Sequence, residues 1–214
     1  MKDLETLSIP DAKLIQIALR ELGLYTGTTA GMPGPKTKAA YKKYLKGFDE
    51  ADEYSATENP IPAILTEILK KEVGVREIGS SNTGVRVREY QDSTDLGGTN
   101  WPWCAALICW GLLQTSKKTS LPFKRPKTAG AWAFEQWARD EGLKLMKPRE
   151  TIKKGDIVVY RFSHIGLAIA DESNKFVECV EGNTDGSGGR EGGGVYQRSR
   201  KVSLIRSHIR LELI

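Results

Sequence analysis

The sequence has few of the features that mark membrane, metal-binding or disulfide-bonded proteins. It contains no run of 18 or more apolar residues, so it offers no transmembrane helix. Residues 1–5 lack the apolar core of a signal peptide, and we therefore expect a soluble protein made in the cytoplasm. Only three cysteines and two histidines are present, and none has metal-ligand spacing. We expect no disulfide framework, no metal and no cofactor.

The charge is basic and unevenly distributed. The formal net charge is +5, with about +4 in residues 1–48, –5 in residues 49–60 and about +6 in the remainder. Basic surfaces favour polyanions, which include nucleic acid, anionic lipid and bacterial wall polymers. The lysines and arginines are scattered and no nucleic-acid-binding motif is present, so we do not expect a nucleic-acid partner.

The acidic stretch predicts a boundary between two domains. Residues 48–60 are rich in Asp and Glu and end at Pro60, which is typical of a linker. The 214 residues suffice for one sizeable domain and a small one. We therefore expect a small domain at 1–47 and a larger one at 61–214.

We expect the small domain to contain two helices joined by a turn. Apolar residues recur at helical spacing until Gly23: Leu14, Ile15, Ala18, Leu19 and Leu22. A turn-rich passage, 25–35, precedes a second expected helix at 36–44. Two short helices bury little surface, so we expect a binding module rather than an enzyme.

The same residues resemble the peptidoglycan-binding domain of bacterial and phage wall hydrolases. The resemblance covers roughly residues 8–46 and rests on Leu14-Ile15-Gln16, Leu19, Leu22-Gly23, Tyr25, Gly27, Gly31, Gly34 and Thr37 with Ala39-Ala40. The chain departs from that motif at Ala30, in place of an aspartate, and at Pro33, in place of an aromatic residue. The resemblance implies a helical fold and peptidoglycan as the partner.

In the larger domain, Cys104 follows Trp101-Pro102-Trp103 and opens an apolar helical pattern. A cysteine in the first turn of a buried helix meets unpaired N–H groups and the positive end of the helix dipole, which favour the thiolate. Cys104 is therefore a candidate nucleophile, although free cysteine is often a small buried apolar residue. Cys109 and Cys179 lie in apolar runs and fit the core better.

Helices are followed by strands in this domain. We expect helices at 63–73, 85–90, from 104 onward and at 129–141, and strands at 156–160, 164–170, 175–181, 195–198 and 203–213. An antiparallel meander after helices indicates an α+β domain. The glycine-rich stretch 186–194 is expected to be a mobile hairpin loop, and a lid is an alternative interpretation.

A cysteine nucleophile needs a base, and the base needs an orienting group. His164 begins an expected strand, where its side chain can face a helix packed on the sheet, so we rank it above His208. Glu181 and Asn183 lie two residues apart on the next strand and would share a face. Either side chain can accept a hydrogen bond from the imidazole while the other holds the loop.

The order of these residues resembles the CHAP family, the papain-like amidohydrolases and peptidases of peptidoglycan hydrolases. The resemblance covers about residues 62–214 and rests on Trp103-Cys104-Ala105, Gly155-Asp156-Ile157-Val158, His164-Ile165-Gly166-Leu167 and Glu181-Gly182-Asn183. It implies that Cys104 attacks an amide, that His164 transfers the proton, and that Glu181 orients His164 with Asn183 assisting. The oxyanion is expected at the Cys104 N–H and a side chain, for which Asn100 is a weak candidate. The acidic pattern of the calcium-binding members does not occur in this chain.

Together the two resemblances imply a modular, monomeric peptidoglycan hydrolase similar to phage endolysins, which wait in the host cytoplasm and then act on the wall. The muramoyl-alanine amide and the stem or cross-bridge peptide bonds are all possible targets. An exported antibacterial effector of the same chemistry, a non-catalytic wall-binding protein, and a cysteine protease or transferase acting on proteins remain alternatives.

Overall fold

The computed structural model describes residues 8–44, 59–79 and 81–214. The chain divides into two compact units, Met1–Asn59 and Pro60–Ile214, which we describe separately. Most of the expected linker, 48–58, lies outside the described residues. Within the described residues, no helix is both long enough and apolar enough to cross a membrane.

The N-terminal unit contains two helical segments around a small core. Helix α1 (Ile9–Glu21) begins at Ser8, whose side chain accepts a hydrogen bond from the Asp11 N–H, as expected of an N-cap. A second helical segment covers residues 35–44. Leu19, Tyr25 and Ala40 form a buried apolar cluster in this unit. The two expected helices are therefore present.

The apolar positions of α1 are only partly buried. The helix buries Ala12, Gln16 and Leu19, whereas Leu14 and Leu22 are 65% and 58% exposed. Of the five apolar positions at helical spacing, only Leu19 is fully buried. In this unit, the small core leaves part of the apolar surface of α1 uncovered.

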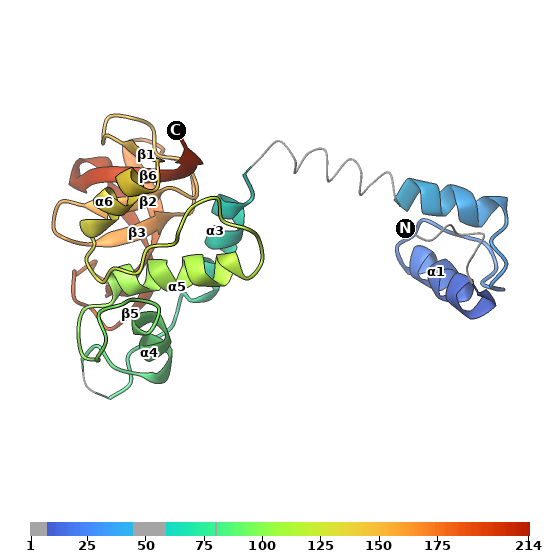
Figure 1. The fold of residues 1–214 in the computed structure, drawn as a ribbon, viewed down its shortest axis with the longest axis horizontal. Helices are drawn as coiled ribbons and strands as arrows, with labels where there is room; N and C mark the ends of the chain where they lie inside the picture. The colour runs from blue at the N-terminus through green and yellow to red at the C-terminus, as the bar shows by residue number, and fades with distance from the viewer. Residues whose placement is uncertain (1–7, 45–58, 80) are drawn as a thin grey trace. The chain divides into compact units, whose positions relative to one another are not determined.

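The C-terminal unit is built on one antiparallel sheet, drawn in Figure 1. Its strands are β1 (Leu143–Met146), β2 (Ile157–Tyr160), β3 (Ile165–Ala168), β4 (Phe176–Thr184), β5 (Gly194–Lys201) and β6 (Ile205–Leu213). They lie in the order β1-β6-β2-β3-β4-β5, and every neighbouring pair is antiparallel. The meander expected from the sequence therefore forms the centre and one edge of the sheet.

Four helices of this unit are α3 (Ile61–Lys71), α4 (Val85–Gln91), α5 (Cys104–Ser116) and α6 (Ala133–Asp140). Helix α5 packs on β3 and β4 and is flanked by α3 and α4, and α6 lies beside β1 and β6 (Figure 1). Because side chains alternate along a strand, Ile157 and Val159 of β2 belong to the helix-facing core, and Val158 and Tyr160 to a smaller cluster. The mixed helix and sheet architecture agrees with the expected α+β class.

Two expectations for secondary structure are corrected. Strand β1 was not expected, and it extends the sheet beyond β6. The helix expected at 129–141 begins only at Ala133. The Gly130 N–H bonds the Thr128 side chain, and the Gly130 carbonyl accepts from the Ala133 N–H. This turn holds residues 129–131 outside the helix, where they line a cavity beside Cys104.

Candidate active site

Cys104 is the first residue of α5 and borders a cavity of about 220 Å³. Its thiol is free, and the residue is 6% exposed. Because the first N–H groups of a helix lack intrahelical acceptors, the sulfur lies at the positive end of α5. The position matches the one expected from the sequence, and a small cavity lies beside the residue.

Trp103 fixes the start of α5. Its backbone N–H donates to Asn183 Oδ1 at 3.1 Å, and its indole N–H donates to Glu77 Oε1 at 2.9 Å. The ring is fully buried and packs against Tyr90, with centroids 5.5 Å apart. These contacts hold the residue immediately before Cys104 on three sides, so the sulfur has a defined position.

His164 is presented by the tight turn between β2 and β3. The Tyr160 N–H donates to the His164 carbonyl, and Ser163 adopts a left-handed φ of 57° within the turn. The imidazole is fully buried and stacks with the rings of Tyr160 and Phe162, each 5.8 Å away between centroids. Its Nε2 lies 3.0 Å from Glu181 Oε2. The ring orientation is therefore set by stacking and by one carboxylate.

The second ring nitrogen of His164, Nδ1, is buried and has no hydrogen-bond partner among the described residues. By elimination it is the nitrogen available to a thiol. Burial alone would lower the pKa of His164, but interactions with the Cys104 side chain and with Glu181 raise it to about 9. The surroundings of the ring thus favour a proton on the imidazole.

Glu181 is the centre of a buried polar network. Its Oε1 accepts from the Tyr160 hydroxyl and from Arg200 Nε, each at 2.8 Å, and its Oε2 accepts from Arg200 Nη2 at 2.5 Å. Burial alone would raise the pKa of Glu181, but the hydrogen bonds from Arg200 and His164 hold it below its ordinary value. The Arg200 guanidinium also lies over the Tyr160 and Phe162 rings. A charged carboxylate is therefore maintained beside His164.

Asn183 serves a different position from Glu181. Its Oδ1 accepts from Trp103, and its Nδ2 donates to Asn82 Oδ1 at 2.9 Å and to the Gly192 carbonyl at 3.1 Å. The side chain makes no hydrogen bond to His164 within the described residues. The expectation of a regular strand face shared with Glu181 does not hold, because Asn183 has a φ of 55° and the β4–β5 register shifts there. Of the two alternatives, Glu181 contacts the imidazole and Asn183 holds the loop.

Two glycines allow α5 and β3 to approach β4 closely. A Cβ on Gly182 would lie 2.7 Å from the Trp103 ring and 2.8 Å from the Leu107 side chain. A Cβ on Gly166 would lie 2.7 Å from Glu181 Cγ. The absence of side chains at these positions brings the Cys104 helix and the Glu181 carboxylate to one place.

Asn100, the side chain considered for the oxyanion, is exposed and does not line the cavity beside Cys104. The structure gives no support to that assignment. The Trp103 N–H is already occupied by Asn183. The donors that remain at this end of α5 are the backbone N–H groups of its first turn, which begins at Cys104.

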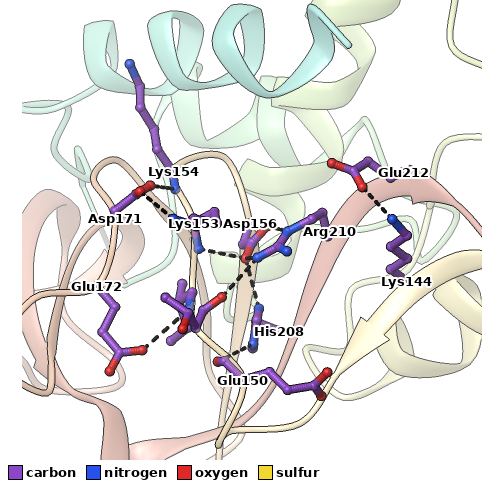
Figure 2. Close-up of polar contacts among 12 residues, drawn as sticks. Lys144, Glu150, Lys153, Lys154, Asp156, Asp171, Glu172, His208, Arg210 and Glu212 are labelled. Carbon is purple, nitrogen blue, oxygen red and sulfur yellow. Dashed lines mark hydrogen bonds and ion pairs between the residues drawn. The ribbon is translucent and has the colours of Figure 1, made fainter. Parts of the chain in front are cut away.

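The other histidine belongs to a separate network, shown in Figure 2. His208 lies on β6, with Nδ1 2.9 Å from Asp156 Oδ2 and Nε2 3.1 Å from the Glu150 carbonyl. Arg210 donates to both oxygens of Asp156. Because both ring nitrogens of His208 are engaged, neither is available to a thiol, and the Asp156 of the sequence motif has a structural role here.

The remaining cysteines are enclosed by protein. Burial raises the pKa of Cys109 to about 12, and burial also raises that of Cys179 well above its ordinary value. The Cys109 thiol donates to the Thr128 carbonyl. Both cysteines therefore have the properties of core residues, as expected.

Several residues of the site were not predicted from the sequence. Arg200 and Tyr160 donate hydrogen bonds to Glu181. Glu77 accepts one from Trp103, and Asn82 accepts one from Asn183. A cationic partner for Glu181 could have been expected in general, because a buried carboxylate requires a cation or several donors. Nothing in the local sequence distinguishes Arg200 from its exposed basic neighbours.

Comparisons with known proteins found no family model that matches the chain and no curated protein that matches its sequence.

Among the described residues, no group of three or more His, Cys, Asp or Glu is placed to bind a metal ion. The two carboxylates before the cysteine helix are paired instead, Asp92 with Arg88 and Asp95 with Lys127.

Proposed function

We propose that this protein is a modular peptidoglycan hydrolase that cleaves an amide bond by cysteine catalysis. The observation that carries the proposal is the buried pair of His164 and Glu181, whose imidazole interacts with the Cys104 side chain at the start of a helix, next to a cavity. Nucleophile, base and orienting carboxylate are the three parts that cysteine hydrolysis requires. The resemblance to the CHAP family adds the substrate class.

In the proposed reaction, the proton of the Cys104 thiol has already passed to His164, which leaves a thiolate and an imidazolium, and the sulfur then attacks the carbonyl carbon of the amide. A C–S bond forms, and the oxyanion is met by N–H groups of the first turn of α5. His164 then gives its proton to the leaving amine as the C–N bond breaks. Water, deprotonated by His164, attacks the thioester and releases the acid and the free thiol.

Glu181 and Asn183 act through other groups in this scheme. Glu181 holds the His164 ring and stabilises the imidazolium, and its own charge is maintained by Arg200. Asn183 positions the Trp103 backbone and hence the sulfur. The two residues thus prepare the base and the nucleophile separately.

The N-terminal unit is proposed to bind the wall. The glutamine of its motif, Gln16, has a structural role: it bonds the Gly31 N–H, the Met32 carbonyl and the Thr37 hydroxyl. Exposed Ile9, Leu14 and Met32 are available to contact a partner. Tethering to an insoluble polymer would raise the effective substrate concentration without new contacts in the active site.

The bond cleaved is either the muramoyl-alanine amide or a peptide bond of the stem or cross-bridge. An endolysin that reaches the wall from the host cytoplasm and an exported antibacterial effector share this chemistry. We favour the endolysin, because the N-terminal resemblance includes phage wall hydrolases. The protein is proposed to act as a monomer.

The test is mass spectrometry of fragments released from purified peptidoglycan by the wild type, Cys104→Ala and the matched control Cys109→Ala. We expect fragments from the wild type and from Cys109→Ala only, and their new amine ends identify the bond. Equal release by Cys104→Ala would exclude Cys104 as the nucleophile. No release by any folded variant, with wall binding intact, would favour the non-catalytic wall-binding protein.

A further inference from the structure

The cavity beside Cys104 has one charged side chain in an otherwise small or apolar lining. Besides Cys104, the lining includes the apolar residues Leu96, Trp101 and Pro102, the small polar residue Ser163, and Arg190. The apolar residues of the lining offer no partner for a charge, and Ser163 offers only a neutral hydroxyl. Arg190 is therefore the group in this lining that can recognise a charge on a bound molecule.

Arg190 projects from a loop whose backbone is held on both sides of it. On one side, the Gly189 carbonyl accepts from the Thr184 hydroxyl at 2.6 Å, and the Gly189 N–H donates to Asp185 at 2.8 Å. On the other side, the Gly192 N–H donates to the Asn183 carbonyl at 3.1 Å. These bonds hold the backbone on both sides of Arg190 and so fix the point from which its side chain extends.

The loop is also tied to the residues that prepare the catalytic groups. The Asn183 side chain bonds both the Trp103 N–H and the Gly192 carbonyl. Arg200, the partner of Glu181, donates to the Gly188 carbonyl at 3.1 Å. The position of Arg190 is thus coupled to that of Cys104 and of His164.

The guanidinium of Arg190 is weakly engaged by protein. Within the described residues its ion pair is with the adjacent Glu191, at 3.3 Å, and the two side chains are 50% and 62% exposed. An exposed pair between sequence neighbours contributes little free energy. A substrate carboxylate that displaces water in the cavity would form a stronger, charge-assisted pair, because guanidinium geometry matches a carboxylate in two parallel hydrogen bonds.

We propose that Arg190 binds a free carboxylate of the substrate next to the amide that Cys104 attacks. The inference rests on the proposed function and narrows its substrate class: the preferred stem peptides carry an ionised carboxylate near the scissile bond, and peptides with that group amidated are poor substrates. Arg190 is a specificity-determining residue in this scheme, distinct from the catalytic groups.

The test compares two synthetic muropeptides that differ only in whether that carboxylate is free or amidated. We expect wild-type kcat/KM to favour the free acid by about 10- to 100-fold, the range of a charge-assisted bidentate pair. Arg190→Gln should raise KM for the acid, leave kcat nearly unchanged and abolish the preference. The matched control Arg161→Gln, which removes a surface arginine outside the cavity lining, should retain the preference.

Binding measured in the Cys104→Ala background separates the inference from the proposed function. Calorimetry should show tighter binding of the acid than of the amide, and Arg190→Gln should remove the difference. If the wild type cleaves neither peptide but this Arg190-dependent binding is present, the inference stands and hydrolysis is excluded. Equal cleavage of acid and amide by the wild type overturns the inference alone, and absence of both cleavage and binding overturns both.

Discussion

Arg200 donates two hydrogen bonds to Glu181, from Nε to Oε1 at 2.8 Å and from Nη2 to Oε2 at 2.5 Å. Both side chains are almost wholly enclosed, with exposed fractions of 9% and 0%. A carboxylate buried to this extent is tolerated only when it is paired. The arrangement links β5 to His164, the candidate general base, because the same carboxylate also bonds its imidazole.

Replacement of Arg200 by methionine should therefore cost both stability and activity. Removing one partner of a buried pair leaves an uncompensated charge, and we expect the free energy of unfolding to fall by about 3–5 kcal/mol. Denaturant titration measures this loss. The control Lys201→Gln, an exposed neighbour on the same strand, should lie within about 0.5 kcal/mol of wild type. Comparable stability of the two variants would show that the buried pair is not required.

The pH dependence of activity should report the His164 imidazolium. Its pKa is raised from the ordinary 6.5 to about 9, so the proton donor for the leaving amine is lost as the pH rises through about 9. We expect kcat/KM to fall along an alkaline limb near that pH. The same raised pKa contributes stability that is complete below about pH 6.5 and is lost as the pH rises through about 9.

Glu181→Gln should move this alkaline limb to lower pH by about 1–3 pH units, because a neutral amide stabilises the imidazolium less than a carboxylate. The profile of kcat/KM against pH, recorded on the folded variant, makes the comparison. An unchanged limb would mean that Glu181 does not set the charge of His164.

Asn183→Ala should lower kcat without moving the alkaline limb. Asn183 accepts from the Trp103 N–H and bonds the loop, whereas the His164 Nε2–H donates to Glu181 instead. The loss of an acceptor for a buried N–H displaces the start of α5, and a small displacement of a nucleophile is sufficient to slow the reaction. A shift of the limb in Asn183→Ala, equal to that in Glu181→Gln, would contradict the separate roles of the two side chains.

The sequence predicted Cys104 and His164 better than the residues that hold the site in place. Cys104 at a helix start and His164 immediately before a strand follow from periodicity and turn residues, which are local signals. Arg200 and Tyr160 reach Glu181 through strand pairing and were not predicted, because register and burial are decided by the whole sheet. The alternation of β5 alone does not show which basic side chain is buried.

The errors in secondary structure have the same origin. Strand β1 is only four residues long and forms by pairing with β6, so no periodic pattern in the sequence indicates it. Residues 129–131 have helical composition, but a local turn and the packing beside Cys104 keep them outside the helix. The exposure of Leu14 reflects the small size of the N-terminal core rather than its own sequence.

The three cysteines should differ sharply in reactivity. Iodoacetamide reacts with thiolates, and burial raises the pKa of Cys109 to about 12 and that of Cys179 well above its ordinary value. Cys104 borders a cavity beside His164. We expect peptide mapping of the native protein labelled near pH 7 to find modification at Cys104 alone. Labelling of all three in urea is the control, and native labelling of Cys109 at a similar rate would contradict the assignment.

The two histidines provide the last contrast, since each is buried and each bonds a carboxylate. The ring nitrogens of His208 face two acceptors, Asp156 and the Glu150 carbonyl, so its role is to satisfy buried oxygens (Figure 2). His208→Ala should reduce the free energy of unfolding by about 1–3 kcal/mol, the cost of leaving buried polar groups unpaired. Measured below its unfolding temperature, this variant should keep the alkylation rate of Cys104.

His164→Ala should show the reverse pattern, with lysis abolished and wall binding retained. Removal of the ring also removes the raised pKa and the hydrogen bond to Glu181, so the Cys104 alkylation rate near neutral pH should fall with it. Lysis assays, wall pull-down and alkylation kinetics on both variants decide the matter. If His208→Ala abolished lysis in folded protein while His164→Ala remained active, the base would be assigned to the wrong histidine.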